Sequence, residues 1–229
     1  MSLPSIIAVD GPAGSGKSTI SHQLAERYGY LFIDTGIFYR TMTLVALRAG
    51  IPFSNTDALT TLTENTHIDI ISQNDDPTHP YAVFVEGEDV TNQIRTPQVE
   101  ASVSALSAIG SVRAALVEQQ RRIAAKGNII MAGRDIGTVV LPHADVKLYI
   151  DASIQERARR RFQERVSQGQ SANLAEIEAA MVQRDRVDSE REVSPLRQAK
   201  DAIYISTDNK SIEQVLGEIG EKLEIWQPA

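Results

Sequence analysis

The feature that most constrains this chain is a glycine-rich loop near its N-terminus, which reads GPAGSGKST. It matches the phosphate-loop pattern G-x-x-x-x-G-K-[ST] in full. The glycines permit a tight turn in which successive amide N–H groups point inward at phosphate oxygens. A strand over Ser5–Asp10 is expected before the loop and a helix over Lys17–Tyr28 after it, so that the start of the helix faces the anion. The residues expected to bind nucleotide phosphates are Gly11, Pro12, Ala13, Gly14, Ser15, Gly16, Lys17, Ser18 and Thr19.

Two residues at the end of this loop carry its chemistry. Lys17 supplies a positive charge to the outer phosphates, and Ser18 offers a hydroxyl that can ligate Mg²⁺. The alternative is an accidental match in a glycine-rich turn, and the expected strand and helix on either side argue against it. The sequence therefore predicts a nucleotide phosphate site with Mg²⁺ as its cofactor.

Composition excludes several classes of protein. The chain has 229 residues, of which 42% are hydrophobic and 23% charged, as is typical of one globular core that can carry a small insertion. It has no cysteine, so neither disulfides nor a cysteine zinc site is expected. No apolar run is long enough to span a bilayer, and the N-terminus lacks the layout of a signal peptide. We therefore expect a cytoplasmic protein without a membrane partner.

The charge distribution narrows the class of ligand. A net charge of −7 argues against a nucleic-acid partner, which would require a basic face. Nine of the 23 Lys and Arg residues nevertheless lie between Arg157 and Arg197, and all nine are Arg. An acidic protein with a local arginine cluster favours a compact anionic ligand over a polymer. The sequence shows no obvious association surface, so we expect a monomer.

The order of elements indicates an α/β fold with a central parallel sheet flanked by helices. A strand over Leu31–Gly36 follows the first helix, and this βαβ order predicts parallel strands. Two alternating segments, His67–Ile71 and Tyr81–Val85, with turn residues Asn74–Pro77 between them, predict a small antiparallel insertion. We expect one domain, with a core at about 1–65, 97–151 and 171–229, an insertion at about 66–96 and a lid at about 152–170.

The remaining elements follow from local patterns. Two helices are expected between Pro97 and Lys126, and another from Leu174 to about Arg186. Ser211 and Gln214 have the spacing of a capping box and predict the start of a closing helix. Further strands are expected over Asn128–Ala132, Val146–Asp151 and Ala202–Ser206.

A second ligand position is expected where the second strand ends and the next helix begins. Thr35, Tyr39 and Arg40 fall there, and ligands of open α/β sheets bind beyond the carboxyl ends of the strands. A helix-capping Thr beside a surface Tyr and Arg is the alternative interpretation.

The segment Gly133–Thr138 follows another buried strand and is the next candidate. Arg134 and Asp135 stand between two glycines at the carboxyl end of that strand, which packing alone does not explain. A turn stabilised by an Arg–Asp ion pair is the alternative.

The arginine-rich region opens at Ala152. Arg157, Arg160 and Arg161 have the spacing i, i+3 and i+4, which places them on one face of a helix. Arg184, Asp188 and Arg191 have the spacing i, i+4 and i+7 and form one stripe if the second helix extends that far. Surface ion pairs explain any single arginine equally well. Two such groups around the linker Gln168–Ser171 favour a mobile phosphate-binding lid.

With these residues in hand, the chain closely resembles the bacterial cytidylate kinases, which are P-loop nucleoside monophosphate kinases. The motifs that carry the resemblance run nearly from end to end: GPAGSGKS (11–18), DTGIFYR (34–40), EGEDVTNQIRTPQV (86–99), GRDIGTVV (133–140) and RDRVDSEREVSPL (184–196). The loop alone occurs in many families, whereas the others are far more specific. The resemblance implies a P-loop kinase core with a monophosphate-binding region, an inserted small sheet and an arginine-rich lid.

The resemblance also implies site residues. Thr35, where family members often have Ser, would hold the CMP phosphate together with Arg40 and Arg134. The cytosine base would be read by Ser104, Arg113 and Asp135, and CMP is also expected to contact Tyr39. Arg184, Asp188 and Arg191 would reach the phosphate and sugar of the acceptor, and Arg157 and Arg161 would bind ATP from the lid. The expected catalytic group is Lys17, Arg134, Arg184, Asp188 and Arg191.

The implied activity is ATP-dependent phosphorylation of CMP and dCMP to CDP and dCDP, by in-line transfer with Mg²⁺. Another small-molecule P-loop kinase, acting on AMP, UMP or shikimate, is the nearest alternative. A GTPase-type switch is disfavoured because the nearest match to its N-K-x-D motif, Asn209–Ile212, lacks the Asp. An ATPase acting on DNA or RNA is disfavoured by the net charge.

Overall fold

The computed structural model describes residues 3–72 and 81–224. The chain divides into two compact units, one made of Met1–Tyr30 and Ile130–Ala229 and the other of Leu31–Ile129. They are called unit 1 and unit 2 below. Each has its own secondary structure and its own buried residues, and each is described by itself.

Unit 1 is built on parallel strands, as the βαβ order predicts. Its strands have the order β6-β1-β7-β8. Strand β1 pairs with β7 in parallel, with Ile7 opposite Val146, and β7 pairs with β8 in parallel, with Leu148 opposite Ile203. Apolar side chains run continuously along β1 and β6 because both faces of a parallel sheet are buried. The strands of unit 1 are β1 (Ile6–Asp10), β6 (Ile129–Gly133), β7 (Val146–Asp151) and β8 (Ile203–Ser206), whereas β2 (Leu31–Asp34) belongs to unit 2.

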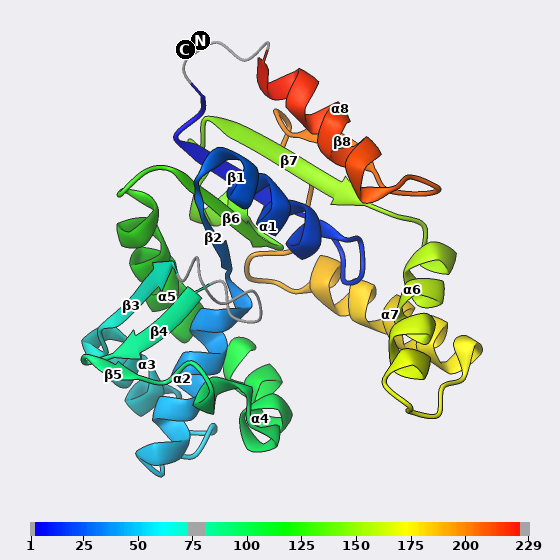
Figure 1. Cartoon of the computed structure of the whole chain (residues 1–229). Coiled ribbons are helices and arrows are strands. Elements are labelled where there is room, and N and C mark those ends of the chain that lie inside the picture. Colours follow the sequence, from blue (N-terminus) through cyan, green and yellow to red (C-terminus); the bar gives the residue numbers. More distant parts are fainter. Residues whose placement is uncertain (1–2, 73–80, 225–229) are drawn as a thin grey trace. The chain divides into compact units, whose positions relative to one another are not determined.

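Two pairs of helices complete unit 1 (Figure 1). Helices α1 (Lys17–Tyr28) and α8 (Ile212–Glu224) contact each other beside the sheet. Ser211 and Gln214 exchange hydrogen bonds of 2.8 and 3.3 Å, which confirms the predicted capping box. Helices α6 (Ile154–Ser167) and α7 (Leu174–Glu190) pack on each other around a small core of Ala158, Ile177 and Met181.

Unit 2 combines helices with the small antiparallel sheet. Strands β3 and β4 pair antiparallel, with Ile70 opposite Val83, and β4 pairs with the short β5. This confirms the antiparallel insertion, although the turn expected at Asn74–Pro77 lies outside the described residues. The elements are α2 (Gly36–Arg48), α3 (Thr56–Asn65), β3 (Ile68–Ser72), β4 (Tyr81–Val85), β5 (Glu88–Asp89), η1 (Gln93–Arg95), α4 (Pro97–Ser107) and α5 (Gly110–Ala124).

Two elements differ from the sequence-based expectation. Helix α7 ends at Glu190, beyond the predicted end near Arg186, and an ion pair of 2.9 Å between Arg186 and Glu190 lies along its last turn. The second, which the sequence did not predict, is a single π-helical turn, η2 (Ile136–Val140), after β6. Such turns occur mostly as single turns and often at functional sites.

The helices were also compared with the length and hydropathy that a membrane span requires. No single helix among residues 3–72 and 81–224 meets that requirement. Helices α4 and α5 meet it only jointly, across a bend of 104°.

Candidate functional site

The phosphate loop joins β1 to α1 and is held by its own backbone. Lys17 is buried, and its ammonium group donates to the Pro12 carbonyl at 3.1 Å, across the loop. Gly11 is required because a Cβ there would lie 2.0 Å from the Ile150 carbonyl oxygen of the neighbouring strand. Helix α1 begins directly after Gly16 of the loop, so the positive end of its dipole faces the loop and favours an anion there.

Two side chains from distant segments bond the carbonyl groups of this loop. Arg157 on α6 donates from Nη1 to the Ala13 carbonyl at 3.2 Å, and Thr207 donates from Oγ1 to the Ser15 carbonyl at 3.0 Å. With their carbonyl groups bonded on the outside, the loop residues present amide groups inward. The loop is therefore organised before a nucleotide arrives.

Arg157 is a buried connector in this structure. Only 5% of the residue is exposed, and its other nitrogens donate to the Ala152 carbonyl at 2.9 Å and to Asp185 Oδ2 at 2.6 Å. The guanidinium thus links α6, α7 and the phosphate loop. Its predicted contact with ATP is untested and remains a prediction.

The three arginines of α6 that were predicted to share one face, Arg157, Arg160 and Arg161, do not all have the same surroundings. Arg160 bonds both the hydroxyl and the carbonyl of Thr207, at 3.0 and 2.8 Å, and so follows Arg157 towards the loop. Arg161 is exposed and forms an ion pair of 2.7 Å with Glu164 on its own helix. The spacing correctly indicated a helix, but only two of the three side chains turn to the phosphate loop.

Four charged residues from two distant motifs come together in unit 1. Arg134 donates from Nε to Asp188 Oδ2 at 2.9 Å, and both side chains are less than one-fifth exposed. Arg191 lies 3.8 Å from Asp135 and 4.0 Å from Asp188. The Gly133–Thr138 segment and the end of α7 are therefore neighbours. Alternating charges of this kind hold guanidinium groups in place without a ligand.

Arg184 differs from these neighbours. It lies on α7, is exposed, and has no hydrogen bond or ion pair with any residue of the described ranges. An exposed guanidinium carries five donors that suit an anionic ligand.

The sequence reasoning assigned no role to Asp10. Its side chain is buried at the end of β1, and its two oxygens accept the amide N–H groups of Ile136 and Gly137 at 2.7 and 2.8 Å. Burial raises the pKa of this carboxyl to about 6, with a further contribution from Asp135, against the opposing effect of Lys17 and the two amide bonds. The sequence signal that could have identified Asp10 is a charged residue at the end of an apolar strand, directly before the phosphate loop.

The first residues of α2 hold the predicted acceptor residues of unit 2. Thr35 is buried at the start of α2, and Asp34 Oδ1 accepts the Gly36 amide at 3.0 Å. Arg40 is one-third exposed and forms an ion pair with Glu100 of α4. Burial raises the pKa of the Tyr81 hydroxyl to about 12, and the nearby Asp34 carboxylate contributes to this shift.

The two residues of unit 2 that were predicted to read the base differ in exposure: Arg113 is buried and Ser104 is exposed. The buried Arg113 guanidinium lies 5.1 Å from the centre of the Tyr39 ring, a cation–π contact that fixes both side chains. Ser104 lies exposed on α4. The structure thus gathers Tyr39 and Arg113 by direct contact, whereas Ser104 is placed by its helix alone.

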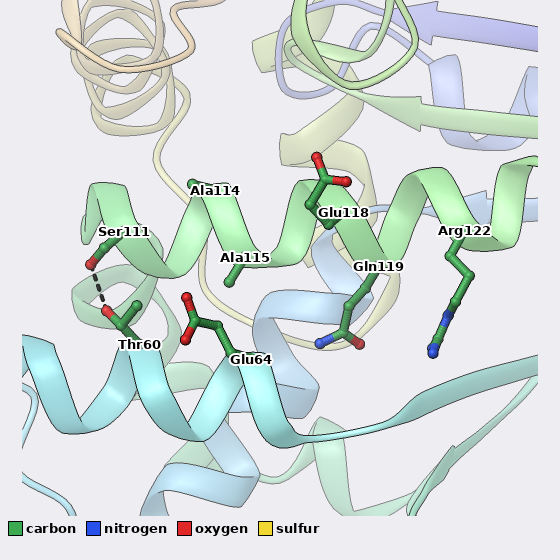
Figure 2. Close-up of a pocket in the computed structure, with 8 residues that line it drawn as sticks. All are labelled: Thr60, Glu64, Ser111, Ala114, Ala115, Glu118, Gln119 and Arg122. Atoms are coloured by element: carbon green, nitrogen blue, oxygen red, sulfur yellow. Dashed lines mark hydrogen bonds between the residues drawn. The ribbon is translucent and has the colours of Figure 1, made fainter.

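A groove in unit 2 lies apart from these residues (Figure 2). It has a volume of about 620 Å³ between α3 and α5, and Figure 2 shows Thr60 and Ser111 joined by a hydrogen bond at one end. None of the predicted site residues lines it. It therefore adds nothing to the candidate site.

Comparison with known proteins supports one family. The model of the family described as cytidylate kinase matches residues 7–224. The cytidylate kinase of Geobacillus sp. (strain WCH70) is 46% identical over 215 residues, covering 94% of each chain. That of Geobacter sulfurreducens is 48% identical over 211 residues, covering 92% of this chain and 89% of the relative.

Solved structures agree at the level of the fold. The crystal structure of an uncharacterized protein from Eubacterium ventriosum aligns with a TM-score of 0.52 at 13% identity, covering 96% of this chain and 99% of that one. The family match over nearly the whole chain is far more specific than this likeness. The chain belongs to the cytidylate kinase family.

Proposed function

We propose that this chain transfers the γ-phosphoryl group of ATP to CMP and dCMP, giving CDP or dCDP and ADP. The observation that carries the proposal is the match to the cytidylate kinase family over residues 7–224. The phosphate loop and the four-charge cluster of unit 1 supply the groups that phosphoryl transfer requires.

On the donor side, the loop from Gly11 to Thr19 binds the phosphates of ATP. Lys17 is already directed across the loop and neutralises the outer phosphates. Arg157 and Arg161 are proposed to contact ATP from α6. For Arg157 this follows from its bond to the Ala13 carbonyl, which places the guanidinium against the loop itself.

The donor chemistry of the loop suits Mg²⁺. This ion prefers oxygen ligands and takes one or two of them from protein, with the others from phosphates and water. The Ser18 hydroxyl at the start of α1 is such an oxygen and would hold the ion. When bound, Mg²⁺ supplies positive charge to the phosphate oxygens.

On the acceptor side, the family motifs supply the residues proposed to bind CMP. A carboxylate at Asp135 accepts from the cytosine N4 amino group, which uracil lacks, and Arg113 donates to acceptors of the base. The phosphate and sugar are assigned to arginines and hydroxyl-bearing or acidic residues. The full set proposed for CMP is Thr35, Tyr39, Arg40, Ser104, Arg113, Arg134, Asp135, Arg184, Asp188 and Arg191.

The chain needs no strong general base for this reaction. A phosphate monoester is already largely ionised at neutral pH, since its second pKa is about 6. The work of the protein is to align the two phosphates and to neutralise charge on the transferring group. Arg134 and Arg191 are held by Asp188 and Asp135 before substrate binds, so little reorganisation remains when charge develops.

The lid expected at about 152–170, a cytoplasmic location, a monomeric state and the absence of nucleic-acid and membrane partners all remain predictions. Closure over both substrates would exclude water and limit wasteful hydrolysis of ATP. Helix α6 and the linker after it lie in the predicted lid.

An acceptor panel tests the proposal. ADP release is measured with ATP and each of CMP, dCMP, UMP, AMP and shikimate. We expect kcat/KM for CMP and dCMP to exceed that for the other acceptors by about 100-fold or more, because an unpaired polar group in the base site is costly. A preference for any other acceptor would refute the assignment.

The exposed arginine of α7 gives a second test. Arg184→Ala should lower kcat by about 100-fold or more at saturating substrates, with an unchanged melting temperature, because the side chain has no described intramolecular partner. Arg186→Ala is the matched control, since Arg186 is exposed on the same helix and pairs only with Glu190. Equal activity of the two variants would remove Arg184 from the mechanism.

A further inference from the structure

The end of β1 makes a long-range contact that the proposed function does not explain. Asp10 directly precedes the phosphate loop, and its carboxylate accepts the backbone N–H groups of Ile136 and Gly137, which lie 126 and 127 positions further along the chain. Both bonds are short and buried, at 2.7 and 2.8 Å. One carboxylate therefore ties two loops that follow adjacent strands of unit 1.

The second loop needs this carboxylate because of its local structure. Residues 136–140 form a π-helical turn, in which the Asp135 carbonyl accepts from Val139 and Val140 at 2.8 and 3.0 Å. The first amide groups of any helical turn have no partner inside the turn. Asp10 supplies that partner from a different strand.

The turn lies close to two side chains at Gly137. A Cβ at Gly137 would lie 3.3 Å from Asp10 Oδ2 and 3.1 Å from Lys147 Cδ. Both contacts are tighter than an ordinary van der Waals contact, so an added Cβ would require the Asp10 carboxylate and the Lys147 side chain to shift by a few tenths of an ångström.

The turn carries two residues of the charge cluster on its N-terminal side. Arg134 and Asp135 directly precede the two amides that Asp10 holds, and they contact Asp188 and Arg191. A shift of the turn would move both side chains relative to the phosphate loop. Displacements of about 1 Å are enough to lower rates by roughly 100-fold in phosphoryl-transfer geometry.

We propose that Asp10 is a positioning residue for phosphoryl transfer. By holding the amides of Ile136 and Gly137, it fixes the Arg134–Asp135 segment against the strand that carries the phosphate loop. It acts through the backbone of that segment and touches neither nucleotide. The kinetic part of this inference rests on the proposed function, whereas the structural part does not.

The first test uses Asp10→Asn with Asp145→Asn as its matched control. Asp145 also accepts a backbone amide of β1, that of Ile6 at 2.9 Å, but at the opposite end of the strand and in an exposed position. Asn keeps the size of the side chain but offers only one acceptor oxygen, so one of the two amides loses its partner.

Hydrogen exchange measures the link without any substrate. Peptides covering residues 134–141 should exchange at least about tenfold faster in Asp10→Asn than in wild type, and unchanged in Asp145→Asn. Equal exchange in wild type and Asp10→Asn would overturn the proposal, whatever acceptor the enzyme uses.

Kinetics measures the consequence. For Asp10→Asn we expect kcat/KM for CMP to fall by about 10- to 100-fold while KM for ATP stays within about threefold, because the phosphate loop keeps its other bonds. Asp145→Asn should stay within about threefold in both. A parallel loss for ATP and CMP, accompanied by a lower melting temperature, would indicate a structural role only and would overturn the proposal.

A second variant approaches the same contact from the other side. Gly137→Ala keeps the Asp10 side chain but crowds its carboxylate with a Cβ, and should show the same selective loss for CMP. For the double variant Asp10→Asn with Gly137→Ala, kcat/KM for CMP should lie within about threefold of that of the less active single variant, because both substitutions disrupt the same interaction. Fully additive losses would contradict a shared cause. If Asp10→Asn fails to fold, the Gly137→Ala result alone decides the matter.

Discussion

The ends of β1 and β2 have similar local sequences, but their aspartates make different hydrogen bonds. Each apolar strand closes with an aspartate and is followed by a helix, α1 or α2. Asp34 accepts the amide of Gly36, two residues on, and so supports the start of its own helix. Asp10 leaves the start of α1 uncapped and accepts two amides from a turn more than a hundred positions away.

This difference explains how each helix start is used. The Asp10 carboxylate bonds the distant turn instead of the start of α1, where the helix dipole favours an anion. At α2 the Asp34 carboxylate is used locally, and Thr35, Tyr39 and Arg40 are proposed to bind the acceptor through their side chains. We therefore propose that the β1 end recognises an anion through its backbone and the β2 end through side chains.

The largest effect is expected at the β1 end, from Lys17→Ala. The ammonium group is the one charge that the loop directs across its own backbone, and its loss should lower kcat by about 100- to 1000-fold. Steady-state ADP release measures this, with circular dichroism to confirm folding. A folded variant within about tenfold of wild type would break the view that this end binds the transferring phosphates.

The burial of Asp10 at the β1 end predicts a pH-dependent stability. Its pKa is raised from 3.8 to about 6 in the folded protein. Between these pH values the unfolded chain has lost a proton that the folded chain keeps, so the free energy of unfolding decreases as the pH rises. The loss amounts to about 2–3 kcal/mol by pH 7.

Urea unfolding of wild type and Asp10→Asn at pH 4 and pH 7 isolates this contribution, because other titrating groups are common to both. The stability of wild type relative to the variant should be greater at pH 4. Asp135 and Lys17 face the carboxyl and shift the midpoint without changing the sign. A relative stability that rises with pH would contradict the assigned environment.

The β2 end should respond to side-chain removal with a selective effect on the acceptor. Arg40→Ala should raise KM for CMP by about tenfold or more and leave KM for ATP within about twofold. Glu100→Gln is the control, since it removes the ion pair but keeps Arg40. A rise in both KM values in Arg40→Ala, or an equal rise in Glu100→Gln, would contradict the view that Arg40 at the β2 end acts selectively on the acceptor.

The smallest effect is expected from Asp34→Ala. Loss of one local acceptor for the Gly36 amide should lower the free energy of unfolding by about 1 kcal/mol. Thermal unfolding measures this, and Asp10→Ala should lower CMP turnover far more than Asp34→Ala does. Comparable loss of turnover in both would show that the two aspartates do not differ in role.

Several of these features could be predicted from the sequence. The loop, its flanking elements and the capping box at Ser211 are local patterns, and the structure confirms each of them. The family motifs identified Arg134, Asp135, Asp188 and Arg191 as candidates, and the structure brings these four together, while their catalytic roles stay predictions.

What the sequence did not predict depends on long-range contacts. Helical spacing predicted that Arg157 and Arg161 lie on the same face of a helix. In the structure Arg157 is buried against the Ala13 carbonyl, whereas Arg161 is exposed and pairs with Glu164. The π-helical turn is too short to produce a periodic pattern in the sequence. Asp10 itself was a visible charged residue in an apolar strand, whose partner lies more than a hundred residues away.

The most direct test of the central claim is the stoichiometry of products from ATP and CMP. The purified protein is incubated with both nucleotides and Mg²⁺, and ADP and CDP are quantified by chromatography over the same time course. A kinase that aligns the two phosphates and excludes water should form ADP and CDP in equal amounts, with little ADP when CMP is omitted. ADP formed without CDP would contradict the account.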